Sequence, residues 1–244
     1  MSIYKLLVRS LWFYRKQHLA IILATILSTA ILTGALIVGD SIKYSLRQQV
    51  EKRLGATEFV LNTGDRFVRA ELARDIQNAT KSRAISILSL SGISINPDKN
   101  LRIVSTQVIG IDSNFWSFSE INFPKLKNNE AIISQNVAAK LQIEMNDEIL
   151  LRVENSGLIP ANVPFSDENS ATISIRLKIV AIADENQLGS FSLKSNQTAP
   201  YNVFLQRELL CEKLEIAGKA NLILCSEGNN IDEHFLNESL KNIW

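Results

Sequence analysis

The sequence predicts an α+β protein in which an N-terminal transmembrane helix continues into a stalk helix and then into an extracytoplasmic domain. Three observations lead to this fold class: an uncharged apolar run, apolar residues at every fourth position after it, and short alternating stretches beyond residue 55. The domain is expected to have a mixed or mostly antiparallel sheet. The predicted parts are a cytoplasmic amphipathic segment (1–18), a transmembrane helix (19–39), a stalk helix (40–55) and the α+β domain (56–244).

The transmembrane prediction depends on residues 19–38, twenty residues without a charge. At 1.5 Å per residue a helix of this length spans about 30 Å, the thickness of the hydrocarbon layer. A buried core helix is usually shorter and apolar on one side only. The apolar region of a cleaved signal peptide is about 7–15 residues and ends at small residues, whereas Leu36, Ile37 and Val38 close this run. An uncleaved anchor is therefore favoured over a core helix and a signal peptide, and no later segment is apolar enough for a second span.

The charges around the run predict its orientation. Four cations precede it and four follow it: Lys5, Arg9, Arg15 and Lys16, then Lys43, Arg47, Lys52 and Arg53. Long downstream domains cross the membrane largely regardless of charge, whereas short tails obey the positive-inside rule. We therefore expect the N-terminus in the cytoplasm and the domain outside.

Small residues make up nine of the twenty positions in the run: Ala20, Ala24, Thr25, Ser28, Thr29, Ala30, Thr33, Gly34 and Ala35. Such residues allow close approach between helices in lipid, which favours packing against partner helices. On either side, residues 3–16 fit an amphipathic interfacial helix, and a stripe after the run fits a helix lying on a domain. That stripe consists of Ile42, Leu46, Val50 and Leu54, and Gly55 is the expected helix stop.

The domain sequence predicts short strands and helices in alternation. The predicted strands are 58–62, 85–95 (with a bulge at Leu88), 101–111, 130–134, 148–153, 172–183, 201–205 and 220–225. The predicted helices are 66–77, 134–141, 207–216 and 231–244, and residues 155–171 are expected to form a loop. Asn96, Pro97 and Asp98 mark the turn between the second and third strands.

Composition excludes several functions. A formal net charge of +1 over 244 residues provides no field for nucleic acid, so no nucleic-acid partner is expected. The two histidines, His18 and His234, are too few for an ordinary zinc site. The sequence contains no phosphate-binding loop and no nucleophile motif. We therefore predict no catalytic, cofactor-binding or metal-binding residue and no enzymatic activity.

Other polar features have ordinary interpretations. Four acidic pairs, at residues 147–148, 167–168, 184–185 and 232–233, are expected to be solvated loops or caps. The stretch 184–205 is either a surface that docks a partner or an ordered loop whose amides satisfy backbone groups. Cys211 and Cys225 lie in apolar surroundings that favour free buried thiols, although a single bridge stays open.

Several stretches resemble a known family. The run ILTGALIVGDSIKYSLRQQVEKRLGATEFVLNTGDRF resembles the start of ABC-transporter permeases of the MacB/FtsX superfamily, which carry a MacB-like periplasmic core. The stretches GIDSNFWSF, NEAIISQNVAAKLQIEMNDEILLRV and QLGSFSLKSNQTAPYNVF are similar to later parts of the same domain. Many relatives have glycine where this chain has Gln142 and Asn146, and Gln142 puts the local helix stop in doubt.

The resemblance implies a function without bond-making. It implies a bacterial inner-membrane permease subunit that couples ATPase-driven motion to a periplasmic domain. The implied partners are a separate ABC ATPase subunit and further permease helices or a second permease copy. Family permeases continue with more periplasmic chain and at least three more helices, so the expectation is an N-terminal part, from a truncated gene or a split permease. The alternatives are a single-pass anchored binding or sensing module and, less favoured, a secreted hydrolase.

Overall fold

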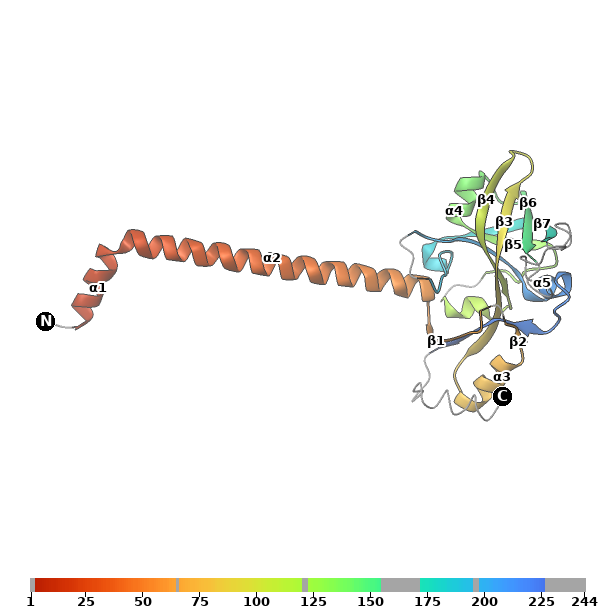
Figure 1. Cartoon of the computed structure of the whole chain (residues 1–244), viewed down its shortest axis with the longest axis horizontal. Coiled ribbons are helices and arrows are strands. Elements are labelled where there is room, and N and C mark those ends of the chain that lie inside the picture. Colours follow the sequence, from red (N-terminus) through yellow and green to blue (C-terminus); the bar gives the residue numbers. More distant parts are fainter. Residues whose placement is uncertain (1–2, 65, 120–122, 155–171, 195–197, 227–244) are drawn as a thin grey trace, which may run out of the picture. The chain divides into compact units, whose positions relative to one another are not determined.

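The computed structural model describes residues 3–64, 66–119, 123–154, 172–194 and 198–226. The chain divides into two compact units, Met1–Val50 and Glu51–Trp244. Figure 1 shows the helices of the first unit and the sheet-rich second unit, each in its sequence colours.

The first unit consists of helix. Helix α1 covers Ile3–Phe13, and α2 covers Arg15–Leu54 as one helix of 40 residues. The prediction that the apolar helix continues without a break past Asp40 is confirmed. Within the described residues, α2 is the one helix long and apolar enough to cross a membrane, with a mean hydropathy of 2.4 in its best window. The division of the N-terminal region into interfacial, membrane and stalk segments stays a prediction.

The hydroxyl groups of three threonines in the apolar part of α2 donate to backbone carbonyl oxygens of the same helix. Thr25 Oγ1 donates to the carbonyl oxygen of Ile21 (2.6 Å), and Thr29 and Thr33 make the same bond one turn further on, at 2.9 and 2.7 Å. In lipid no water is present to hydrogen-bond a hydroxyl, so these internal bonds lower the cost of placing threonine there.

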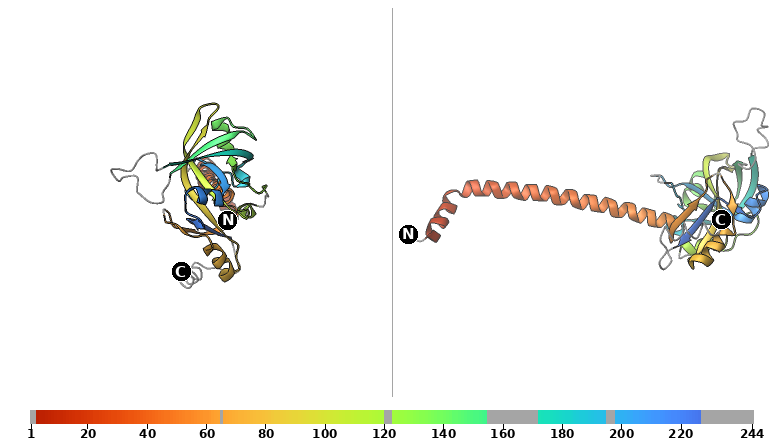
Figure 2. Two further views of the ribbon diagram at one scale, coloured as in Figure 1. Left: turned by 90° about the vertical axis from the view of Figure 1, so that its right-hand side faces the viewer. Right: turned by 60° about the horizontal axis from the view of Figure 1, so that its bottom comes forward.

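The second unit is built on one mixed sheet whose strands close into a ring. Its eight strands follow the order β1-β10-β3-β4-β8-β5-β7-β6, and β3 also pairs with β6. The bounds are β1 Thr57–Asn62, β3 Ala84–Asn96, β4 Leu101–Ile111, β5 Glu130–Ser134, β6 Glu148–Glu154, β7 Thr172–Ala183, β8 Tyr201–Gln206 and β10 Leu222–Ser226. The β3–β6 pairing closes β3, β4, β8, β5, β7 and β6 into a barrel, seen from two sides in Figure 2. The β4–β8 and β5–β7 pairs are parallel and the other pairs are antiparallel.

Strand β3 joins the barrel to the rest of the sheet. Its start pairs with β10, and its second half lies between β4 and β6. Gly92 lies where β6 joins, and a Cβ there would lie 2.7 Å from the carbonyl oxygen of Arg152. Glycine therefore permits the backbone approach that closes the ring.

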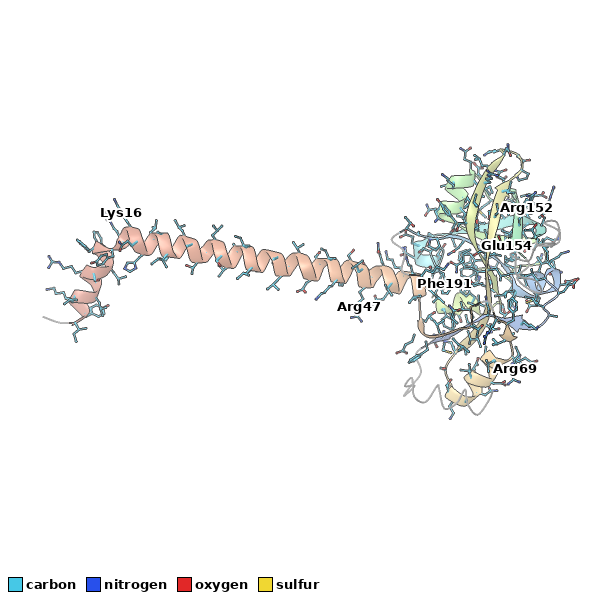
Figure 3. The ribbon with its side chains drawn as sticks, viewed as in Figure 1. Lys16, Arg47, Arg69, Arg152, Glu154 and Phe191 are labelled. Atoms are coloured by element: carbon cyan, nitrogen blue, oxygen red, sulfur yellow. The ribbon has the colours of Figure 1, made fainter. Side chains whose placement is uncertain are left out.

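Helices and apolar clusters cover this sheet. Two short elements, β2 (Val68–Arg69) and β9 (Lys219–Ala220), pair beside it, and the helices are α3 (Leu72–Thr80), α4 (Gln135–Leu141) and α5 (Arg207–Lys213). Helix α3 buries Leu72, Ala73 and Ile76 against β10. A second cluster contains the aromatic side chains of Phe115, Trp116, Phe118, Phe191 and Phe204; Phe191 is labelled in Figure 3.

Most predicted elements of the domain are confirmed, and corrections are needed at three places in the sequence. The predicted helix 66–77 begins at Leu72, because Val68 and Arg69 pair with β9 and the Ala70 N–H donates to the Gly218 carbonyl. The predicted bulge at Leu88 is wrong: the register shift lies between Gly92 and Ser94. Ile87 and Leu88 are both fully buried because they face different clusters.

The third correction concerns the end of the domain sequence. Helix α5 ends at Lys213 rather than at residue 216, and the strand predicted over 220–225 is divided between β9 and β10. The predicted loop 155–171 and the predicted helix 231–244 lie outside the described residues.

Candidate functional site

The end of α2 enters the domain at a short turn, which we call the junction: Leu54, Gly55 and Ala56 together with Phe118 and Leu188. Leu54, the last residue of α2, is half-buried and packs against the aromatic cluster. The Gly55 N–H donates to the carbonyl oxygen of Glu51 and the Ala56 N–H to that of Phe118, both at 2.9 Å. The junction therefore attaches the helix end to the domain by packing and by backbone hydrogen bonds.

Gly55 suits the junction for two reasons. Its φ of +56° lies in the left-handed region, which glycine adopts without steric cost. A Cβ at this position would also clash with the carbonyl oxygen of Phe118 and lie 3.0 Å from Leu188 Cδ2. The predicted helix stop at Gly55 is thus confirmed, and the same residue allows the close contact with Phe118.

One wall of the junction is the 3-10 helix η1, Phe115–Phe118. Its first N–H donates to the carbonyl oxygen of Asp112 at 3.0 Å, and its three aromatic side chains are buried. Arg83 holds it from the side: Nη1 donates to the Ser117 carbonyl at 3.0 Å, and the guanidinium lies 5.7 Å from the Phe118 ring centre. The contacts with Asp112 and Arg83 therefore fix η1, whose Phe118 carbonyl oxygen accepts the Ala56 N–H.

The other wall is the turn that carries Leu188. Asp184 caps the 3-10 helix η2 (Glu185–Gln187), and the backbone N–H of Asp184 donates to Gln187 Oε1 at 3.1 Å. The fully buried Asn202 donates from Nδ2 to the carbonyls of Gly189 (2.9 Å) and Phe191 (2.8 Å). Gln187 and Asn202 therefore satisfy backbone groups, as the ordered-loop interpretation of residues 184–205 expected. Docking of a partner on this stretch stays a prediction, and residues 195–197 lie outside the described part.

An ion-paired cluster lies at the start of the segment that leads to η1. Arg207 Nε lies 3.0 Å from Asp112 Oδ1, and Nη2 lies 3.0 Å from Glu208 Oε1. The first of these contacts joins Arg207 to Asp112 as an ion pair. Arg207 Nη1 also donates to Ser86 Oγ on β3 at 2.8 Å. A cavity of about 480 Å³ adjoins the cluster, and Trp116 and Lys125 are among its lining residues.

The two carboxyl groups of this cluster titrate differently. Burial raises the pKa of Asp112 from 3.8 to about 6, Arg207 opposes this shift, and the neighbouring Glu208 adds to it. Burial also acts to raise the pKa of Glu208, but its backbone hydrogen bond and Arg207 outweigh burial and lower it. Sequence reasoning missed this cluster, because Asp112 and Arg207 meet only through the parallel pairing of Ile111 with Gln206.

A family model described as the MacB-like periplasmic core domain matches residues 19–221, which is most of the chain. The chain belongs to this family. The match begins inside α2, so the apolar helix and the junction both lie in the matched region. The ABC-transporter permease resemblance seen in the sequence is therefore confirmed at the level of the family.

Two solved structures are similar to this MacB-like chain. The periplasmic region of MacB from Actinobacillus actinomycetemcomitans is 10% identical, with a TM-score of 0.45, covering 80% of this chain and 85% of that one. The extracellular domain of the noncanonical ABC-type transporter YknZ from Gram-positive bacteria is 6% identical, with a TM-score of 0.44, covering 71% and 78%. No curated protein matches the sequence significantly. The family assignment depends on the family model alone.

The acidic residues of the MacB-like domain form no candidate metal centre in its described part. Within that part, no group of three or more His, Cys, Asp or Glu side chains is arranged to hold a metal ion. The acidic pairs at 147–148 and 184–185 act locally, because Asp147 Oδ2 accepts the Glu144 N–H and Asp184 caps η2. The pairs at 167–168 and 232–233 lie outside the described residues. The absence of enzymatic activity stays a prediction.

Proposed function

We propose that this MacB-like chain acts in a permease subunit of an ABC exporter or mechanotransmission complex, where α2 carries ATPase-driven displacement to the domain. The observation that supports this is the unbroken helix from Arg15 to Leu54, which ends directly at the junction. A continuous helix resists bending, whereas a Gly/Ser linker would absorb a displacement.

The proposal includes partners and a location. The partners are a separate ABC ATPase subunit and either further permease helices or a second copy, which would pack on the small residues of the apolar run. The location is the inner membrane, with the N-terminus in the cytoplasm. A reporter fused after Trp244 that is active only outside the cytoplasm should therefore be active, and a protein of full-length mass should stay in the membrane fraction. A soluble form cleaved near residue 39 would contradict the anchor.

The coupling is tested by changing the stiffness of α2 at constant length. Three glycines inserted after Ser41 should abolish export by the complete assembly while membrane insertion and the domain fold persist. Three alanines at the same place add the same length and rotation but continue the helix. We expect the alanine variant to retain more export than the glycine variant. Equal export by the two insertion variants, or wild-type export by the glycine variant, would refute coupling through α2.

A second candidate is a membrane-anchored binding or sensing module. The cavity of about 480 Å³ beside Arg207 favours it, because a cavity with aromatic and charged lining residues is a usual form of ligand site. An ATPase gene next to the gene for this chain supports the permease, whereas a neighbouring kinase gene supports the sensor. Copurification of the chain with an ATPase would decide between them.

A further inference from the structure

Two carboxylates share one guanidinium at the end of strand β4. Asp112 and Glu208 both lie 3.0 Å from Arg207 nitrogens. The side chains of Arg207 and Asp112 are 13% and 29% exposed, whereas that of Glu208 is 57% exposed. When both acids are ionised, this partly buried cluster carries one excess negative charge. Taking up one proton removes that charge, which is favourable where solvation is poor.

The surrounding groups leave these two acids as the titrating pair near neutral pH. The basic residues Arg74, on α3, and Lys125, after η1, line the adjoining cavity. Cys211 on α5 is also within electrostatic reach, and burial raises its thiol pKa, so it stays neutral. Ser86 on β3 faces Arg207 as a neutral hydroxyl. A change in charge between pH 5 and 7.5 therefore belongs to the Asp112–Glu208 pair.

Asp112 is also the start of the segment that reaches the junction. Its carbonyl oxygen accepts the Phe115 N–H, and Phe118, three residues further on, accepts the Ala56 N–H. The Asp112 side chain thus ties the beginning of segment 112–118 to the barrel through Arg207, which itself donates to β3. A change in the Asp112–Arg207 contact therefore affects segment 112–118, whose Phe118 carbonyl oxygen holds the end of α2 through Ala56.

We propose that Asp112 and Glu208 hold one shared proton beside Arg207, and that this proton tightens the attachment of segment 112–118 to the barrel. The proton comes from solvent and binds a carboxylate oxygen, so that no other bond changes. This inference concerns the domain itself and does not depend on the proposed coupling.

The direction follows from linkage. Burial raises the pKa of Asp112 from 3.8 to about 6 in the closed structure, while an opened, solvated Asp112 has an ordinary pKa. The closed structure therefore binds the proton better, and it is favoured below about pH 6 and loosened as the pH rises through 6. The full shift corresponds to about a hundredfold change in the opening equilibrium. The opening equilibrium changes over the whole interval between the two pKa values, so the range from pH 5 to 7.5 samples about tenfold of it.

The test uses the full chain in lipid nanodiscs, with Trp12→Phe and Trp244→Phe so that the buried Trp116 is the single fluorophore. Acrylamide quenching of Trp116 and hydrogen exchange of the Ala56 amide, corrected for intrinsic rate, both report opening. Both should increase about tenfold between pH 5 and 7.5, with a midpoint near 6. Asp112→Asn mimics the protonated state and should keep both signals low and independent of pH.

Two further variants separate the proposal from a general effect of pH. Glu208→Gln removes the neighbouring acid and should move the midpoint to lower pH, because Glu208 contributes to the raised pKa of Asp112. Glu212→Gln, an exposed change on the same helix α5, should leave the pH dependence of quenching and exchange unchanged. A flat wild-type response, or the same pH response in Asp112→Asn, would overturn the proposal. If Asp112→Asn does not fold, an unmoved midpoint in Glu208→Gln has the same consequence.

Discussion

The backbone N–H of Ala56 donates a 2.9 Å hydrogen bond to the carbonyl oxygen of Phe118. This bond joins the second residue after α2 to the last residue of η1, whose side chain belongs to the aromatic cluster. Under the proposed coupling, a displacement of the end of α2 would therefore act on a packed aromatic core, which is dense and resists deformation.

Gly55→Ala should be the most damaging single-methyl change at the junction. The new Cβ would clash with the Phe118 carbonyl and would also occupy a left-handed conformation. We expect a loss of about 3 kcal/mol or more in the free energy of unfolding, from left-handed strain plus overpacking. Urea unfolding of the detergent-solubilised chain, followed by tryptophan fluorescence, measures it.

Gly218→Ala is the matched control for this prediction. Gly218 also has a positive φ (+69°), but a Cβ there meets nothing within 4 Å. Gly218→Ala should lose about 1 kcal/mol of unfolding free energy, the cost of the left-handed conformation alone. Equal losses in the two variants would mean that the Phe118 contact does not constrain position 55.

The sequence could predict α2 and most strands because their signals are local. The apolar run, the four-residue stripe and Gly55 follow one another along the chain, so they indicate one helix and its end without knowledge of the fold. The alternation in residues 172–183 is equally local, and β7 covers those residues as predicted.

The barrel closure and the ion-paired cluster could not be predicted in this way. The β3–β6 pairing joins Gly92 to Val153, and the β4–β8 pairing joins Ile111 to Gln206. No sequence pattern specifies which strands meet across such distances. The predicted start of α3 was wrong for the same reason. Val68 and Arg69, which were expected in its first turn, pair with β9 instead.

Gln142→Gly should stabilise the domain. Gln142 has a φ of +53° where α4 ends, and its side chain is exposed, so the helix stops at this position although the residue is not glycine. Relief of about 1 kcal/mol of strain is offset in part by the larger unfolded-state entropy of glycine, so we expect a gain of about 0.5 kcal/mol. Asn146→Gly, at φ +77°, should change stability less because asparagine tolerates this conformation. A loss of stability in Gln142→Gly would contradict this account of the helix end.

Asn202→Leu tests the buried amide that holds the Leu188 turn. The change leaves the carbonyl oxygens of Gly189 and Phe191 without a donor in a fully buried site. Leaving two buried acceptors unsatisfied should cost about 2–4 kcal/mol of unfolding free energy. The half-buried Asn136 donates to the carbonyls of Ala199 and Pro200, where water can replace it, so Asn136→Ala should cost about 1 kcal/mol. If thermal and urea unfolding rank the two variants in the opposite order, the Leu188 turn does not depend on Asn202.

Counting thiols decides whether Cys211 and Cys225 are bridged. Both are free and buried in the structure, in different apolar clusters. Burial raises the pKa of Cys225 to about 11 and also raises that of Cys211, against the opposing effect of Arg207. Because the thiolate is the reactive form, neither should react with a maleimide at pH 7.5 in the folded chain. Both should react after unfolding without reductant, while an added exposed thiol, Ser105→Cys, should react in the folded chain. An unfolded wild-type chain that shows no thiols until it is reduced would establish the bridge instead.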